Sequence, residues 1–135
     1  MLILGLLAGA ALAGAKLAAI GPTAADAWRH CIDATTTNTE WSGCGAAYLD
    51  RLDTELNAAW KRANADLDQP SRNQLLEEQR AWLKFRDASC QVYANGAFGR
   101  EGQVLHFTAC RGEIIEARIA TLNGIYELGH QDTAG

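Results

Sequence analysis

The sequence lacks the excess of positive charge that nucleic-acid-binding proteins carry. Twelve lysines and arginines stand against 16 aspartates and glutamates, a formal net charge of −4. Contact with phosphates needs a basic face, so this balance argues against a nucleic-acid partner. Proline is also scarce, with two residues, which excludes collagen and long Pro-rich linkers. The 48% of hydrophobic residues excludes a wholly disordered chain, and 135 residues suit a single domain.

No hydrophobic run is long enough to cross a bilayer. The run from Leu2 to Ala15 would form a helix of about 21 Å, against about 30 Å of hydrocarbon. It has the length of the hydrophobic region of a secretory signal, although no Lys or Arg precedes it. A short buried N-terminal helix is the alternative.

Two cleavage motifs with small residues follow this run, Ala13-Gly14-Ala15 and Ala25-Asp26-Ala27. The Gly21-Pro22 break favours the second motif. Residues 1–27 are therefore interpreted as a signal peptide, and the protein is expected to be periplasmic or secreted, without stable membrane insertion after cleavage.

The sequence also lacks a C-x-x-C pair. Its cysteines and histidines are scattered, whereas zinc sites need closely spaced ligands, so we expect no metal and no cofactor. In an exported protein, four cysteines predict two disulfides, each stabilising the fold by about 2–4 kcal/mol; free buried thiols are the alternative. The cysteines are Cys31, Cys44, Cys90 and Cys110.

Apolar residues recur every three or four positions in three stretches, at about 38–66, 70–94 and 103–127. Thr37 and Glu40 have the spacing of a capping box before the first stretch, and Asp68 and Pro70 are typical of a helix start before the second. Gly112 is expected to weaken the third helix locally. No alternating pattern indicates a strand.

These stretches predict an all-α domain over residues 28–129, an antiparallel three-helix bundle with a short N-terminal lead-in, stapled by two disulfides. Residues 95–102 contain three glycines and are predicted to form a loop, and residues 130–135 a disordered tail. Antiparallel packing brings the cysteines to one end, which leaves three pairings open. We favour Cys31–Cys44 and Cys90–Cys110 because they close the shortest loops, with 12 and 19 intervening residues.

Several polar residues lie near the apolar stripes of these helices. Buried charges must be paired, so we expect an ion network that fixes the helix register, with amide side chains hydrogen-bonded to it; a polar binding pocket or a catalytic carboxylate is the alternative. The charged members are Asp53, Arg86, Asp87 and Arg118, and the amides are Asn57 and Gln79. We expect no enzyme, because the serines lack a histidine partner and no glycine-rich segment follows a strand.

The spacing of these residues resembles the LprI-like domain family, small exported bacterial domains named after a mycobacterial lysozyme inhibitor. The resemblance spans Cys31 to about Leu122, and it departs from the family pattern at Trp60, where tyrosine is usual, and at Ile115, where threonine is expected. It implies export, disulfides, a helical fold and lysozyme inhibition. The matching motifs are Thr37-x-x-Glu40-x-x-x-Cys44, Asp53-x-x-Leu56-Asn57-x-x-Trp60, Gln79-x-x-Trp82-x-x-x-Arg86-Asp87-x-x-Cys90, and Cys110 with Arg118.

Two functional hypotheses follow. The first is a protein-binding inhibitor whose partner is a cationic lysozyme, attracted by the negative net charge. Phe98 and Arg100 in the predicted loop are the candidates for entering the substrate cleft, and Glu77 and Glu78 are further contact candidates; a plain helix connection and solvated helix surface are the alternatives. The second is a structural or adaptor domain of the cell envelope that binds another envelope protein or a small ligand.

Overall fold

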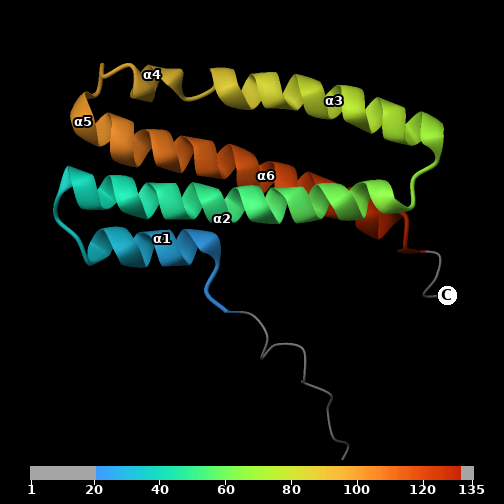
Figure 1. Ribbon diagram of the computed structural model, residues 1–135, viewed down its shortest axis with the longest axis horizontal. Coiled ribbons are helices and arrows are strands. Elements are labelled where there is room, and N and C mark those ends of the chain that lie inside the picture. The colour runs from blue at the N-terminus through green and yellow to red at the C-terminus, as the bar shows by residue number, and fades with distance from the viewer. Residues whose placement is uncertain (1–20, 132–135) are drawn as a thin grey trace, which may run out of the picture.

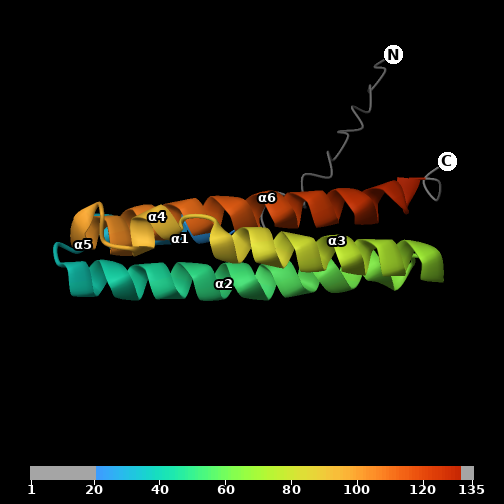
Figure 2. The ribbon, with the colours of Figure 1, turned by 90° about the horizontal axis from the view of Figure 1, so that it is seen from above.

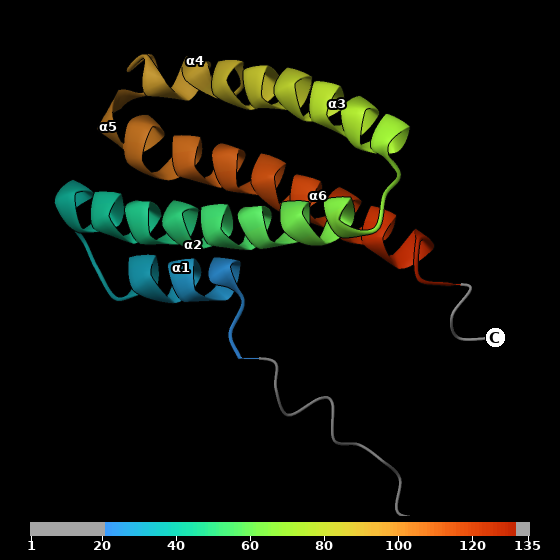
Figure 3. The ribbon, with the colours of Figure 1, turned by 45° about the vertical axis from the view of Figure 1, so that its right-hand side comes forward.

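The fold is all-α, and the predicted bundle is confirmed. The computed structural model describes residues 21–131, and it contains no strand within that range. Two long helices, α2 (Asn38–Ala65) and α6 (Phe107–Leu128), run antiparallel and side by side (Figure 1). Helix α3 (Gln69–Ala88) lies on one face of this pair and α1 (Ala24–Asp33) on the other (Figures 2 and 3). The short elements α4 (Gln91–Ala94), α5 (Gly99–Glu101) and the π-helical turn η2 (Gly102–His106) connect α3 to α6.

Local signals set the start of each long helix. The Thr37 hydroxyl accepts from the Glu40 amide at 3.2 Å, and the Glu40 carboxylate accepts from the Thr37 amide at 3.1 Å, which is the predicted capping box. Helix α3 starts with the Asp68 carboxylate accepting from the Ser71 amide at 2.8 Å, with proline in its first turn. The predicted bounds of α2 and α3 are thus correct at these ends.

The core lies mainly between α2 and α6, where Leu52, Ile115 and Leu122 are fully buried. The two helices approach closely where Gly112 faces Tyr48: a Cβ at Gly112 would lie 2.5 Å from the Tyr48 hydroxyl oxygen. That hydroxyl donates to Glu116 at 2.9 Å, and burial raises the pKa of the phenol. Gly112 therefore lowers helix propensity but allows the Tyr48 ring to pack directly against the α6 backbone.

The predicted N-terminal lead-in is a ten-residue helix, α1, which begins at Ala24. The Thr23 hydroxyl caps it, Ala24 is buried, and Trp28 stacks on Tyr48 with 5.0 Å between ring centroids. The sequence did not reveal this helix, because Ala25 and Ala27 match a cleavage motif. The rest of the predicted signal peptide, residues 1–20, and residues 132–135 of the predicted tail lie outside the described residues.

The second predicted helix, 70–94, is interrupted. Ser89 is extended, with φ −69° and ψ 150°, and Cys90 is left-handed, with φ +71°, so α3 stops at Ala88 and α4 forms a single turn. The predicted loop 95–102 is also partly helical, since it contains α5. The third predicted helix extends over η2 and α6, from Gly102 to Leu128.

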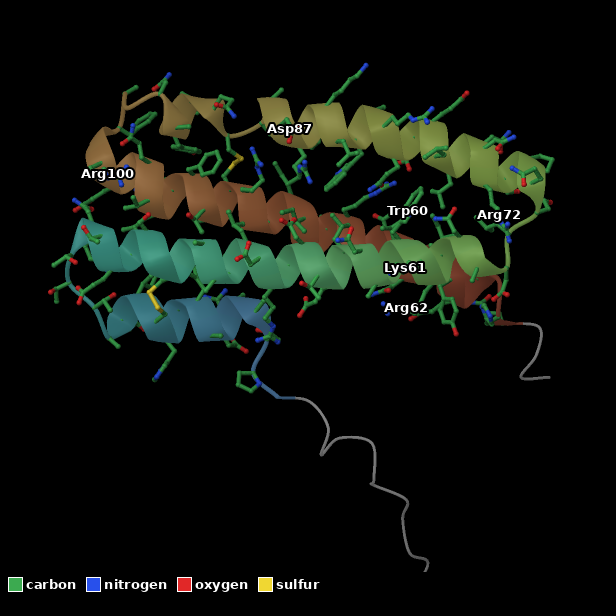
Figure 4. All side chains as sticks on the ribbon, viewed as in Figure 1. Trp60, Lys61, Arg62, Arg72, Asp87 and Arg100 are labelled. Carbon is green, nitrogen blue, oxygen red and sulfur yellow. A yellow bond between two sulfur atoms is a disulfide. The ribbon has the colours of Figure 1, made fainter. Side chains whose placement is uncertain are left out.

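Both predicted disulfides are present. Cys31–Cys44 joins α1 to α2, with 5.7 Å between Cα atoms, and Cys90–Cys110 joins the start of α4 to α6, with 5.9 Å. Both lie in the same half of the bundle, as the two yellow bonds in Figure 4 show.

Candidate functional site

A groove of about 550 Å³ runs between α2 and α3. Its lining residues are three or four positions apart on each helix, so one face of α2 and one face of α3 form the two walls. Figure 4 shows Trp60 between these helices. We name this feature the α2–α3 groove; it is lined by Asp53, Leu56, Asn57 and Trp60 from α2, and by Leu76, Gln79, Arg80, Leu83 and Arg86 from α3.

Arg118 forms the main polar link between α6 and α3. Its side chain is 3% exposed. It donates to the Glu78 carboxylate at 2.6 and 2.5 Å, and to the side-chain amide oxygen of Gln79 at 2.8 Å. Its guanidinium carbon lies 5.6 Å from the ring centre of Trp82. The hydrogen bonds from Arg118 lower the pKa of Glu78. Two parallel charge-assisted bonds hold Gln79 and α3 in register with α6.

Within residues 21–131 the other members of the expected network make no hydrogen bond or ion pair with this cluster, although Arg86 lies 5.6 Å from the centre of the same Trp82 ring. Arg86 donates to its neighbour Asp87 at 3.0 Å, and Arg111 lies 4.0 Å from the same carboxylate. Asp53 and Asn57 are exposed at the α2–α3 groove, and their side chains make no hydrogen bond or ion pair with residues 21–131. The structure therefore divides the six residues between an Arg118 cluster, an Arg86–Asp87 pair and two unpaired groups.

Glu78 was predicted as a contact residue, but its ion pair with Arg118 was not predicted. The Glu77-Glu78 pair had the pattern of solvated helix surface, and the Glu78 side chain is indeed 55% exposed. The signal that could have found it is Arg118 itself, because an arginine on an apolar stripe requires a carboxylate within reach of a neighbouring helix.

Residues 95–101 form an exposed end loop beside the Cys90–Cys110 disulfide. Phe98 is 58% exposed and lies 5.5 Å from the Tyr93 ring, centroid to centroid. Arg100 donates to Gln103 at 3.2 Å (labelled in Figure 4). A Cβ at Gly102 would lie 2.7 Å from the Phe98 Cβ, so the loop packs closely against η2. The end loop thus exposes the Phe98 ring and the Arg100 guanidinium on a backbone that is already packed against η2.

The predicted contact residues form two separate sites. Glu77 lies on α3, about 16 Å along the helix axis from Ala88, so neither it nor Glu78 belongs to the end loop with Phe98 and Arg100. Within residues 21–131 no group of three His, Cys, Asp or Glu side chains could hold a metal ion. No helix in this same range is long and apolar enough to span a membrane.

The described residues thus form a small helical domain with two disulfides, the α2–α3 groove and the exposed end loop. A family model described as lysozyme inhibitor LprI matches residues 31–122, more than half of the chain. The chain belongs to this family. No curated protein and no solved structure matched it.

Proposed function

We propose that this protein is an exported inhibitor that binds lysozyme through its end loop. The observation that carries the proposal is the exposed Phe98 beside Arg100, in a chain whose family is described as lysozyme inhibitors. Aromatic and arginine side chains supply most of the binding energy in many interfaces. A loop already packed against η2 loses little conformational entropy on binding.

The mechanism follows from the chemistry of the two partners. Lysozyme cleaves glycosidic bonds with two carboxylates in an open cleft. Arg100 would meet these carboxylates while Phe98 occupies a sugar-binding position, so that substrate is excluded. The net charge of −4 attracts a cationic enzyme over long range and raises the association rate.

Export supports the same function. The two disulfides are typical of an oxidising compartment outside the cytoplasm. Together with the apolar N-terminal run, they support a periplasmic or secreted protein, where it would meet lysozyme.

The test is a titration of lysozyme-driven cell-wall lysis with the purified, oxidised protein. We expect lysis to stop near one equivalent, and Phe98→Ala and Arg100→Ala each to weaken inhibition about tenfold, which corresponds to about 1.4 kcal/mol. Phe85→Ala is the matched control, because Phe85 is 57% exposed but lies on α3. Undiminished lysis at a tenfold excess of protein would disprove the proposal.

A second function is supported by the groove between α3 and α6. It measures about 480 Å³, and its lining includes Trp82, Phe85 and Ile114. An exposed apolar groove of this kind suits an envelope adaptor that binds another protein without affecting lysozyme. Capture of an envelope protein that is lost in Phe85→Ala and retained in Phe98→Ala would favour this function over the first.

A further inference from the structure

We propose that the α2–α3 groove binds a chain of N-acetylated amino sugars. This site is separate from the end loop, and the proposal does not rest on lysozyme inhibition. It would give the protein a second activity, the binding of a glycan that is built from amino sugars, as cell-wall glycans are.

The groove contains polar groups that make no hydrogen bond or ion pair within residues 21–131. Gln79 is 9% exposed, and Arg118 occupies its carbonyl oxygen, so the amide N–H groups of Gln79 have no partner in residues 21–131. Asp53 and Asn57 add an unpaired carboxylate and an unpaired amide on the facing wall. Polar groups in a half-closed groove gain most from a ligand that supplies matching donors and acceptors.

The apolar part of the groove suits a sugar ring. Trp60 is half-buried between the helices, and leucines of both walls lie beside it. An aromatic face packs against the C–H face of a pyranose, while amide, carboxylate and guanidinium groups bond its hydroxyls from the edges. The amides of Asn57 and Gln79 distinguish this groove from the groove at Phe85, whose lining includes Trp82 but no amide side chain.

We propose an N-acetylated amino sugar because its acetamido group matches the polar and apolar groups of the groove. Its N–H is a donor for the Asp53 carboxylate, its carbonyl is an acceptor for the Asn57 or Gln79 amide, and its methyl group fits the apolar lining. Asp87 already pairs with Arg86, so Asp53 and Arg80 leave the groove nearly neutral. A neutral glycan therefore fits better than a nucleic acid. The volume lies within the range of about 300–1,000 Å³ for small-ligand sites.

The experiment uses the oxidised protein and a linear β-1,4 tetramer of N-acetylglucosamine, with binding measured by calorimetry and by tryptophan fluorescence. We expect saturable binding to the wild-type protein. Asp53→Ala and Asn57→Ala should each weaken it about tenfold, because each removes a partner of the acetamido group. Asp50→Ala is the matched control: Asp50 is also exposed on α2, one turn earlier, and does not line the groove. A tetramer of glucose, which lacks the acetamido group, should bind at least tenfold more weakly.

Three outcomes would overturn the proposal: no binding of the amino-sugar tetramer, equal binding of both tetramers, or equal losses in Asp50→Ala and Asp53→Ala. All these substitutions are on the helix surface, so melting curves can show that the variants stay folded. The result is also independent of inhibition, because Phe98→Ala should bind the tetramer with wild-type affinity and Asn57→Ala should inhibit lysozyme like the wild type.

Discussion

At the scale of single residues, Arg118 shows how a buried charge is accommodated in a small bundle. The guanidinium is withdrawn from water on α6, and its charge is balanced by a carboxylate whose own side chain is 55% exposed. Such a pair has a lower desolvation cost than two fully buried ions, since Glu78 keeps part of its hydration. Gln79 and the Trp82 ring cover the rest of the cation.

Replacing Arg118 should therefore destabilise the fold more than replacing another arginine of the same region. We expect Arg118→Ala to lower the free energy of unfolding by about 2–3 kcal/mol, because Gln79 loses its donor and a buried cavity opens. Arg86→Ala should cost less than about 1 kcal/mol, since Arg86 pairs with an exposed carboxylate. Urea unfolding of both variants checks this, and equal losses would contradict it.

The pKa of Glu78 predicts a dependence of stability on pH. Its hydrogen bonds from Arg118 lower the pKa below the ordinary 4.5 in the folded state. A lowered folded pKa stabilises the fold above pH 4.5, and this contribution is lost as the pH falls through the folded value. The stability difference between wild type and Glu78→Gln should thus shrink between pH 5 and pH 3. Glu77→Gln, measured by the same urea titrations, is the matched control, because the Glu77 side chain makes no hydrogen bond or ion pair within residues 21–131.

Gly112 was expected to be a weak point of its helix, and the structure gives it a packing role. We expect Gly112→Ala to cost about 1–3 kcal/mol, because the added methyl group would overlap Tyr48. Gly43→Ala is the control: no atom lies within 4 Å of a Cβ there, so the helix should gain up to about 1 kcal/mol. Thermal unfolding of the two variants measures both effects, and a neutral Gly112→Ala would disprove the packing role.

At the scale of elements, the sequence predicted the structure correctly where the signal was local. The capping box at Thr37 and the cap at Asp68 involve residues three positions apart, so the starts of α2 and α3 could be predicted. It failed where distant contacts decide the structure. Helix α1 depends on packing against Tyr48, and the break after α3 coincides with the left-handed Cys90, which is bonded to Cys110 on another element.

The dependence of α1 on its disulfide gives an element-scale prediction. Besides the disulfide, few contacts hold α1, chiefly the buried Ala24 and the half-buried Trp28 ring, which stacks on Tyr48. The double variant Cys31→Ser/Cys44→Ser should lose about 3 kcal/mol. Hydrogen exchange should show the amides of α1 losing protection first, with α2 and α6 still protected. Uniform loss of protection along the whole chain would contradict this.

At the scale of the whole molecule, the sequence pointed to residues of the groove and of the end loop, but it did not predict how these residues are arranged and exposed. Asp53, Asn57, Gln79 and Arg86 were predicted as members of one ion network, whereas in the structure all four line the α2–α3 groove. Which of them are exposed depends on how far α3 lies from α2, a distance that the spacing of residues along each helix does not contain. Phe98 was selected from its loop, but its exposure follows from the packing of that loop against η2.

The packing of the N-terminal residues on the rest of the domain indicates where the mature chain begins. Cleavage after Ala27 would remove the Thr23 cap and the buried Ala24, and it would break the 2.8 Å hydrogen bond from Arg51 to the Pro22 carbonyl oxygen. We therefore expect a secreted chain that starts between residues 16 and 22, consistent with the motif that ends at Ala15. Intact mass and N-terminal sequencing of exported protein check this. If the mature chain started at Trp28, the first turn of α1 would be dispensable, and a chain expressed from residue 28 should then be as stable as one expressed from residue 21.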